Sequence, residues 1–280
     1  MSPLPITFLS DFGLEDEFVG VCHAVISRIV PEACVTDLSH GIRRHDIDHG
    51  ATVLARTLPY AAPGVHLAVV DPGVGTGRRG VAVRTAEQGR LLVGPDNGLL
   101  IAAAQRFGGV AEAADISCSP FGADRASASF HGRDLFAPVT GVLAQGARLE
   151  EVGERLEAHE LVGREPTEPS ARNGTTAARV EGIDRFGNLS LDVGRGLITR
   201  TGLRLGYPLV IELAGERRVE AVFANTFGGV AAGDLLAYID SWGSLSIAVN
   251  RGDAARALGL AIGDQVRLSG AEAPSARQPA

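Results

Sequence analysis

Three polar turns that directly follow apolar runs carry the side chains best suited to chemistry. Asp11, Asp71 and the pair Asp96-Asn97 each stand where such a run ends. If the runs are parallel strands, their carboxyl ends meet at one rim of a sheet, where α/β folds bind ligands. Carboxylates at such a rim can accept protons or hold hydroxyl groups. A single Asp after a strand also commonly caps its own turn, so both interpretations are open for each turn taken alone.

Two arginines and one histidine could join this rim. Arg78 and Arg79 follow the glycine-rich segment 71–77, so one of them can fold back toward Asp71 while the other faces solvent. The spacing does not say which. His131 lies in Ser-Phe-His-Gly-Arg-Asp, just before a predicted helix, where a lone histidine is more often structural. The glycine-rich segment is not a Rossmann fingerprint, because another strand follows it instead of a helix.

A second stretch is dense in potential metal ligands: His40, His45, Asp46, Asp48 and His49. It contains no HExxH pattern, and residues 46, 48 and 49 cannot share one face of a helix. A polar helix start with Asp46 near the N-terminal cap explains the same residues more simply. We therefore expect no metal site and no cofactor.

In the C-terminal third of the chain, aromatic residues lie next to glycine-containing turns. Phe186, Phe227 and Trp242 could stack on a nucleobase, with Asn188 recognising its edge. The alternative is an ordinary barrel corner in which an aromatic ring packs beside a turn. The sequence pattern alone favours the barrel corner.

These residues are positioned by two predicted domains. Residues 1–163 alternate short β-rich runs with helical patterns, including a helix over 149–156, and predict an α/β domain with a mostly parallel, Rossmann-like sheet. Residues 164–174 are polar and read as a linker. Residues 175–269 contain seven short strands separated by glycine turns, which predict an all-β barrel. Residues 270–280 are expected to be a disordered tail.

Composition excludes several classes of protein. The net charge is -7 and all 26 basic residues are Arg, which argues against a nucleic-acid partner and excludes every mechanism that needs a catalytic lysine. Three cysteines without a CxxC spacing fit reduced thiols. No apolar stretch reaches the roughly 20 residues of a membrane span, and the N-terminus lacks a signal-peptide pattern. We expect a cytoplasmic protein with no membrane partner.

Six motifs, in order along the chain, resemble one family: SDFG, VVDPGVGTGRR, GPDNGLL, FHGRDLFAP, IDRFGN and SWGSLSIAVN. The family is that of the S-adenosyl-L-methionine (SAM) hydrolases, also called SAM hydroxide adenosyltransferases, which are homologous to the SAM-dependent fluorinase and chlorinase. The resemblance covers about residues 5–269. It implies an α/β domain, a C-terminal β-barrel, and a homotrimer that binds SAM between the α/β domain of one subunit and the barrel of the next.

The resemblance also implies roles for individual residues. The family's water-activating set falls on Asp71, Arg78 and His131, with Asp71 and His131 expected to accept hydrogen bonds from the water. The implied SAM contacts are Asp71 itself, Asp11 at the ribose hydroxyls, Asp184 at the methionine ammonium, Asn188 and the backbone around Val249 at the adenine, Phe186 and Phe227 beside the rings, and Ser241 at the carboxylate, with Trp242 in place of the fluorinase's Arg.

The implied reaction is hydrolysis of SAM to adenosine and L-methionine by in-line attack of an activated water at C5′. The fluorinase carries an insertion before its PNNGLL-like turn, whereas this chain runs directly from Arg84 to Leu91. That difference and the complete Asp-Arg-His set both favour hydroxide over halide as the nucleophile. A SAM-dependent halogenase and a SAM- or adenosine-binding protein without turnover remain the alternatives.

Overall fold

The computed structural model of the chain describes residues 2–122, 129–163, 169–172 and 174–270. It consists of two compact units, Met1–Glu165 and Pro166–Ala280, each with its own hydrophobic core. The expected tail beyond Gly270 lies outside the described residues. No helix among the described residues is long and apolar enough to cross a lipid bilayer.

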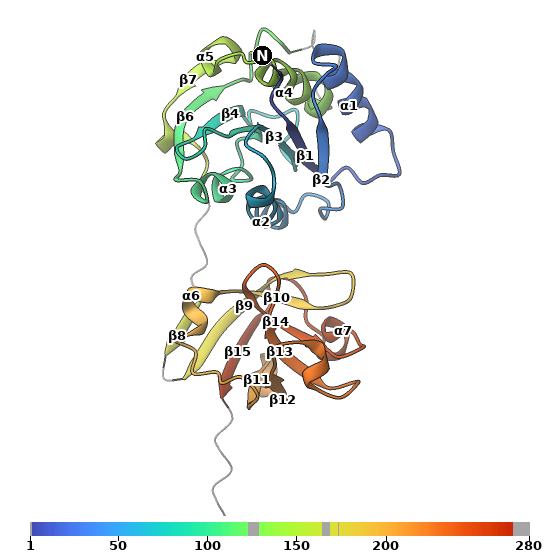
Figure 1. Cartoon of the computed structure of the whole chain (residues 1–280), viewed down its shortest axis with the longest axis vertical. Helices are drawn as coiled ribbons and strands as arrows, with labels where there is room; N and C mark the ends of the chain where they lie inside the picture. The colour runs from blue at the N-terminus through green and yellow to red at the C-terminus, as the bar shows by residue number, and fades with distance from the viewer. Residues whose placement is uncertain (1, 123–128, 164–168, 173, 271–280) are drawn as a thin grey trace, which may run out of the picture. The chain divides into compact units, whose positions relative to one another are not determined.

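The N-terminal unit is built on a seven-stranded sheet in the order β2-β1-β3-β5-β4-β6-β7 (Figure 1). Neighbours among β2, β1, β3 and β5 run parallel, and β4, β6 and β7 continue the sheet in antiparallel pairs. The predicted α/β class is confirmed, although the sheet is mixed because a short turn joins β4 directly to β5. The strands are β1 (Ile6–Ser10), β2 (Val35–Ser39), β3 (Val65–Val69), β4 (Gly80–Thr85), β5 (Leu91–Pro95), β6 (Val110–Asp115) and β7 (Glu154–Leu156).

Helices cover both faces of this sheet. In Figure 1, α1 and α4 lie on one side of it and α2 and α3 on the other. Successive residues of β3 therefore enter two different cores, with Leu67 in the first and Ala68 in the second, as its continuous apolar run predicts. The α-helices are α1 (Phe18–Ile29), α2 (Ile47–Thr57), α3 (Ile101–Gln105), α4 (Ala137–Ala144) and α5 (Leu149–Val152).

The edge of the sheet differs from the sequence prediction. The helix expected over 149–156 ends at Val152, and the chain continues as β7, which pairs with β6. Gly153 allows this change, because a Cβ there would lie 2.2 Å from the carbonyl oxygen of Asp115. Strand β6 was not predicted, since its Val-Ala-Glu-Ala-Ala-Asp sequence has few residues that favour strands.

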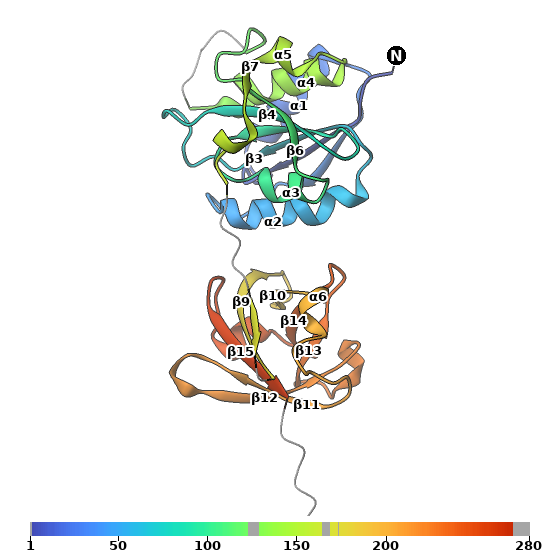
Figure 2. The ribbon, with the colours of Figure 1, turned by 90° about the vertical axis from the view of Figure 1, so that its left-hand side faces the viewer.

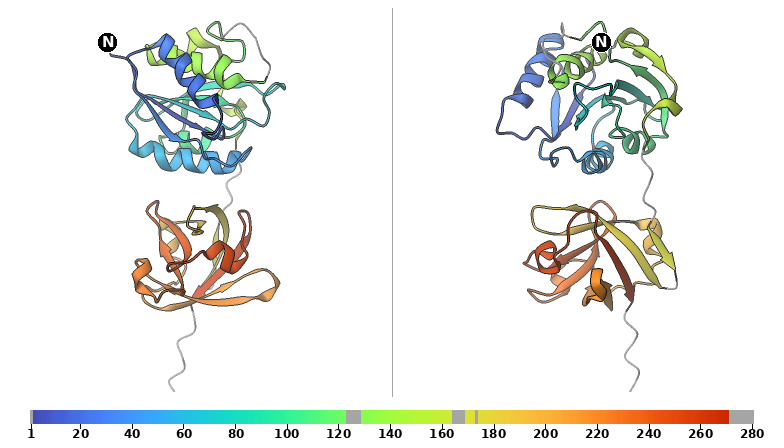
Figure 3. Two further views of the ribbon diagram at one scale, coloured as in Figure 1. Left: turned by 90° about the vertical axis from the view of Figure 1, so that its right-hand side faces the viewer. Right: turned by 180° about the vertical axis from the view of Figure 1, so that it is seen from behind.

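The C-terminal unit is a closed barrel (Figures 2 and 3), and seven strands form its ring. The order β10-β14-β13-β12-β11-β15-β9 is closed by the β9–β10 pairing, so no edge of these seven strands is left open. All seven predicted strands are present. They are β9 (Thr175–Ile183), β10 (Leu189–Gly194), β11 (Pro208–Glu212), β12 (Arg218–Phe223), β13 (Leu235–Ile239), β14 (Ser244–Val249) and β15 (Gln265–Gly270).

Part of the segment read as a linker belongs to this barrel. Ser170–Arg172 forms β8, which pairs with β9 and lies outside the closed ring of strands. The rest of the expected linker, apart from Pro169 and Gly174, lies outside the described residues.

Candidate active site

The three polar turns predicted to share a rim do so. β1, β3 and β5 are adjacent and parallel, so the turns after them lie at the same edge of the sheet. The backbone N–H of Asp11 donates to the carbonyl of Val69 (3.3 Å), and the Asn97 amide donates to the carbonyl of Val70 (2.9 Å). These bonds join the turns that carry Asp11, Asp71 and Asn97.

Asp71, Arg78 and His131 form one hydrogen-bonded group at this rim. Arg78 Nε donates to Asp71 Oδ1 at 3.0 Å, and Arg78 Nη2 donates to Asp71 Oδ2. The same Nη2 lies 3.1 Å from Nδ1 of His131. The side chains of Arg78 and Asp71 are only 8% and 6% exposed. Shielding from water strengthens such a charge-assisted pair, and the two-pronged contact fixes the orientation of the carboxylate.

The glycine-rich turn explains how Arg78 returns to Asp71. Thr76 Oγ1 donates to the carbonyl of Gly73 at 2.6 Å and accepts from the backbone N–H of Arg78 at 3.3 Å. Gly75 has φ 77°, a conformation that other residues adopt only at a cost. The turn therefore returns the Arg78 guanidinium to Asp71, the residue with which the turn begins, before the chain enters β4.

His131 is positioned at the start of a short helical turn. It precedes a π-helical turn, Gly132–Phe136, which continues directly into α4. A Cβ on Gly132 would lie 2.9 Å from the ring of Phe12, so this close approach requires glycine. π-Helical turns are rare and are frequent at functional sites. The geometry thus favours the functional interpretation of His131 over the structural one.

The contacts of Arg78 determine which ring nitrogen of His131 carries the proton. A guanidinium only donates, so Nδ1 must accept, and the proton of the neutral ring then resides on Nε2. Arg78 Nη1 is buried and has no hydrogen-bond partner among the described residues. The group therefore holds an N–H donor that the described residues leave unsatisfied.

Arg79, whose side chain is 32% exposed, pairs with Asp96. Its Nε and Nη2 donate to Asp96 Oδ2 at 3.0 and 2.7 Å, and the other Asp96 oxygen accepts from the backbone N–H of Val162 at 2.8 Å. Both oxygens of the Asp96 carboxylate thus accept hydrogen bonds, and one of these bonds fixes the segment that follows β7. Of the two neighbouring arginines, only Arg78 belongs to the candidate site.

Asp11 and an aromatic cluster border the group. Asp11 Oδ2 accepts from the backbone N–H of His45 at 2.9 Å, which fixes this carboxylate at the rim. The rings of Phe12 and Phe18 lie 5.8 and 5.1 Å from that of Phe130, the residue before His131. The sequence analysis missed this cluster, although the phenylalanines of the SDFG and FHGRD motifs were a usable signal. An apolar wall there lowers the local dielectric constant.

The residues at 40–49 do not converge as a metal site. Asp46 caps α2 by accepting from the backbone N–H of His49 at 2.8 Å and forms an ion pair with Arg43 at 2.7 Å. The interpretation of this stretch as a polar helix start is confirmed. Among the described residues, the one group with ligand atoms close enough to hold a metal combines His40 with His23 and Asp37.

In the barrel, Asp184 organises the turn between β9 and β10. Its Oδ1 accepts from the backbone N–H groups of Phe186 (2.8 Å) and Asn188 (3.0 Å), and its Oδ2 accepts from the Asn188 amide (2.8 Å). The Phe186 ring is 67% exposed and therefore accessible to a ligand.

A second turn, between β13 and β14, carries Ser241 and Trp242. The sequence analysis missed Asp240, whose Oδ1 accepts from the backbone N–H groups of Trp242 and Ser244, both at 2.9 Å. Trp242 is 46% exposed and Phe227, from another loop, 39%. Burial and the nearby carboxylates of Asp240 and Asp184 raise the pKa of Tyr238 to about 12, so this phenol remains a donor.

The two barrel turns lie at opposite ends of β14. Leu189, which follows the Asp184–Asn188 turn, pairs with Ile247 near the end of β14, whereas Trp242 precedes its first residue. Between these ends the two turns are linked by side chains, because Asp240 Oδ2 accepts from Ser190 Oγ at 3.1 Å and from Ser246 Oγ at 2.9 Å.

Comparisons with known proteins agree over both units. Family models of the SAM hydroxide adenosyltransferase N-terminal and C-terminal domains match residues 6–153 and 178–267. An (R)-S-adenosyl-L-methionine hydrolase of Salinispora tropica is 45% identical over 96% of this chain and 99% of its own length. A fluorinase of Actinopolyspora mzabensis is 28% identical, covering 94% and 96%. A crystal structure of a conserved protein from Thermotoga maritima is similar with a TM-score of 0.88 and 36% identity, covering 94% and 99%.

Proposed function

This chain belongs to the SAM hydroxide adenosyltransferase family, and we propose that it hydrolyses SAM to adenosine and L-methionine through Asp71, Arg78 and His131. It is a SAM hydrolase related to fluorinases. The observation that supports the assignment of the site is the buried guanidinium of Arg78, which bonds both the Asp71 carboxylate and His131. We also propose the (R) configuration of the substrate sulfonium, which the name of the Salinispora relative specifies.

The chemistry of SAM sets what the site must supply. The sulfur leaves C5′ as a neutral thioether, so its departure needs neither a general acid nor a metal. The nucleophile is the difficult partner, because bulk water has a pKa of about 15.7. The site must hold one water in line with the C5′–S bond and stabilise it as it becomes hydroxide-like. Such positioning can supply up to roughly 7–11 kcal/mol.

Asp71 is suited to accept a proton or hydrogen bond from that water. Arg78 holds both oxygens of the carboxylate, so the position of any remaining lone pair is fixed before substrate arrives. Its Nη1–H, which has no hydrogen-bond partner among the described residues, supplies positive charge for the developing hydroxide.

For His131 we propose a role other than the expected acceptance of a hydrogen bond. Because its Nδ1 accepts from Arg78, Nε2 carries the proton of the neutral ring, and we propose that it donates this proton in a hydrogen bond to the oxygen of the water or hydroxide. Asp71 is then the acceptor of the water's proton. This division gives the three residues distinct roles: one acceptor, one donor and one cation that orients both.

The remaining contacts follow the geometry of each unit. Asp11 would hold the ribose hydroxyls beside Asp71, and Asp184 the methionine ammonium. Asn188 and the backbone at Val249 would bind adenine between Phe186 and Phe227, with Ser241 and Trp242 at the carboxylate. As the resemblance to the family implies, we propose a homotrimer in which the α/β unit of one subunit and the barrel of its neighbour complete each site.

Incubation with SAM in oxygen-18 water tests this function. Direct attack at C5′ predicts adenosine labelled at O5′ and unlabelled methionine, in amounts that do not depend on added chloride or fluoride. Intact SAM after prolonged incubation would indicate a binding protein without turnover. Formation of a 5′-halogenated nucleoside at the expense of adenosine would identify a halogenase instead.

A further inference from the structure

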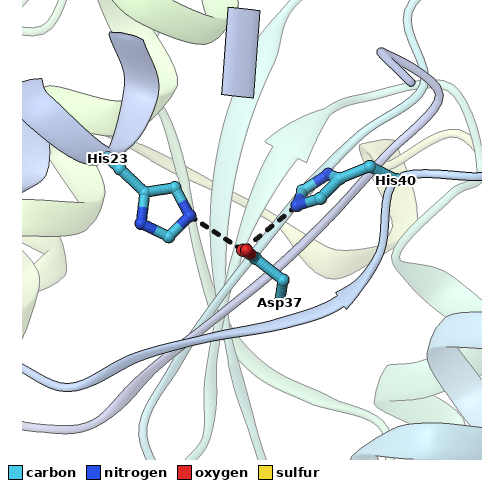
Figure 4. A group of neighbouring side chains, drawn as sticks. All are labelled: His23, Asp37 and His40. Carbon is cyan, nitrogen blue, oxygen red and sulfur yellow. Dashed lines mark hydrogen bonds and ion pairs between the residues drawn. The ribbon is translucent and has the colours of Figure 1, made fainter. Parts of the chain in front are cut away.

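Three side chains outside the proposed active site converge on one point. Nε2 of His23, on α1, lies 2.8 Å from Oδ1 of Asp37, on β2. Nε2 of His40, the residue after β2, lies 3.1 Å from the same oxygen. Figure 4 shows both imidazoles directed at the carboxylate from opposite sides. All three ligand atoms lie within 4.8 Å of one another.

His40 is prepared to act as a ligand. Its side chain is 2% exposed, and its Nδ1 lies 2.7 Å from Oγ of Ser10, which is fully buried. A hydrogen bond from Nδ1–H to an oxygen leaves the Nε2 lone pair directed outward, as in most histidine ligands of metals. Nε2 makes no hydrogen bond with any described residue, despite its closeness to Asp37. A buried ring nitrogen left without a hydrogen bond needs an explanation.

The surroundings leave the cluster partly open beside an apolar surface. The Phe8 ring lies 4.6 Å from that of His40 and 6.0 Å from that of His23. The side chains of His23 and Asp37 are 33% and 41% exposed, which leaves a side open to water.

We propose that His23, Asp37 and His40 bind a divalent transition metal ion of the zinc class, with water completing a tetrahedral shell. Two imidazole nitrogens and one carboxylate oxygen are a common donor set for such ions. Zn–N bonds of about 2.0–2.1 Å place tetrahedral ligand atoms roughly 3.3 Å apart. The observed spacings of 2.8 and 3.1 Å need only small shifts to reach that geometry.

The bound ion would link α1 to β2 through its ligands. His23 lies on the helix, whereas Asp37 and His40 belong to the strand and the residue after it, so the ion would join two elements that are otherwise separated by a loop. Asp71, Arg78 and His131 are not part of this cluster. The ion is therefore a structural element of the α/β domain, and its presence does not depend on the proposed function of the active site.

Zinc titration by calorimetry, on tag-free protein stripped with chelator, tests the site. One zinc ion per chain should bind with micromolar or tighter affinity and raise the melting temperature. His23→Asn and Asp37→Asn should each weaken binding at least tenfold and abolish the thermal shift. His159→Asn, which removes an exposed histidine elsewhere in the same unit, is the matched control and should change neither.

Cobalt substitution gives a second readout that does not depend on stability. Tetrahedral Co²⁺ produces intense visible d–d bands, which should appear with the native protein and disappear in His23→Asn. Because the His23 side chain is partly exposed, we expect the variant to fold, and the melting curve of the metal-free variant checks this directly. Absence of stoichiometric zinc binding by the folded native protein would overturn the proposal, as would zinc binding that His23→Asn leaves unchanged.

Discussion

Nδ1 of His131 lies 3.1 Å from Nη2 of Arg78, across 53 residues of sequence. The same nitrogen of Arg78 also donates to Asp71, so one guanidinium links the only carboxylate and the only imidazole of the proposed water-activating set. Residues coupled in this way act as a unit, and their individual contributions do not add. Loss of any one member should therefore cost nearly as much activity as loss of the whole set.

Asp71→Ala should abolish measurable turnover while SAM still binds. The variant lacks the acceptor for the water's proton, and general-base contributions are on the order of 10²–10⁴-fold. We expect kcat to fall by at least that range and the Kd for SAM, measured by calorimetry, to change much less. Melting curves must show that the variant is folded, because Arg78 loses its partner. Retention of wild-type kcat would refute the assignment of Asp71.

Arg78→Lys should reduce kcat far more than Arg79→Lys, although the two residues are adjacent. A lysine ammonium cannot reproduce the two-pronged contact with Asp71 and the simultaneous bond to His131. Arg79 pairs instead with Asp96, so its substitution should lower the melting temperature without a comparable loss of kcat. Equal losses of kcat in the two variants, both folded, would contradict the separation of their roles.

Local sequence patterns predicted the barrel strands and the rim because these depend on short-range signals. Apolar runs bounded by glycine turns identified the seven strands. The apolar run that forms β3 was expected to be a parallel strand, which predicted that Asp71 would lie at the carboxyl-end rim of the sheet. The family motifs selected Arg78 over Arg79. Spacing alone could not distinguish the two arginines, because both follow the same turn and each pairs with an Asp. Arg78 pairs with Asp71 at the start of that turn, and Arg79 pairs with Asp96 in the turn after β5.

Features that depend on distant residues were not predictable in this way. β6 and β7 form because β6 pairs with β4 on one side and with β7 on the other, which overrides their weak strand propensity. The cluster of His23, Asp37 and His40 likewise requires α1 and β2 to pack together. His23 and Asp37 lie outside the contiguous stretch 40–49, so the local pattern of potential ligands there contains His40 but neither of these neighbours.

Chelators should leave hydrolysis intact while they change stability. The neutral thioether leaving group needs no Lewis acid, so kcat with saturating EDTA should equal kcat without it. The proposed ion at His23, Asp37 and His40 should instead appear as a lower melting temperature after chelation. Assays in parallel buffers with EDTA or with added zinc check both effects. Loss of kcat that zinc restores would show that a metal takes part in the reaction.

His66 should make the protein less stable as the pH falls below neutrality. Its side chain is fully buried, Nε2 lies 3.2 Å from Nη1 of Arg90, and Nδ1 lies 2.9 Å from Oγ1 of Thr7. Burial, with the positive charge of Arg90, lowers the pKa of His66 to about 3. The unfolded chain takes up this proton near pH 6.5, whereas the folded chain does not until about pH 3.

Stability linked to His66 is therefore present above pH 6.5 and is lost as the pH falls toward 3, at about 1.4 kcal/mol per pH unit once the unfolded histidine is protonated. His66→Gln can keep a donor and an acceptor for Thr7 and Arg90 but cannot titrate. Urea unfolding at several pH values should show a shallower loss of unfolding free energy in this variant. His159→Asn serves as the exposed-histidine control, and identical slopes for all three proteins would exclude the effect.

The proposed trimer can be tested together with the division of the site. Asp71 lies in the α/β unit and Asn188 in the barrel, so a shared site draws one residue from each of two neighbouring chains. Asp71→Ala and Asn188→Ala should each be inactive when assayed alone. Co-expression of the two chains with different affinity tags, followed by two-step purification, isolates mixed trimers and proves that the subunits exchange.

Mixed trimers should regain activity only if sites are shared. One interface can then receive Asp71 from one chain and Asn188 from its neighbour, and each purified mixed cyclic trimer holds one such intact site, about a third of its sites. Sites built within a single chain would always carry one of the two substitutions, so no mixture could produce adenosine. Mixed trimers of proven composition that remain inactive would reject the shared site, even if wild-type hydrolysis and the trimer itself were established by sedimentation.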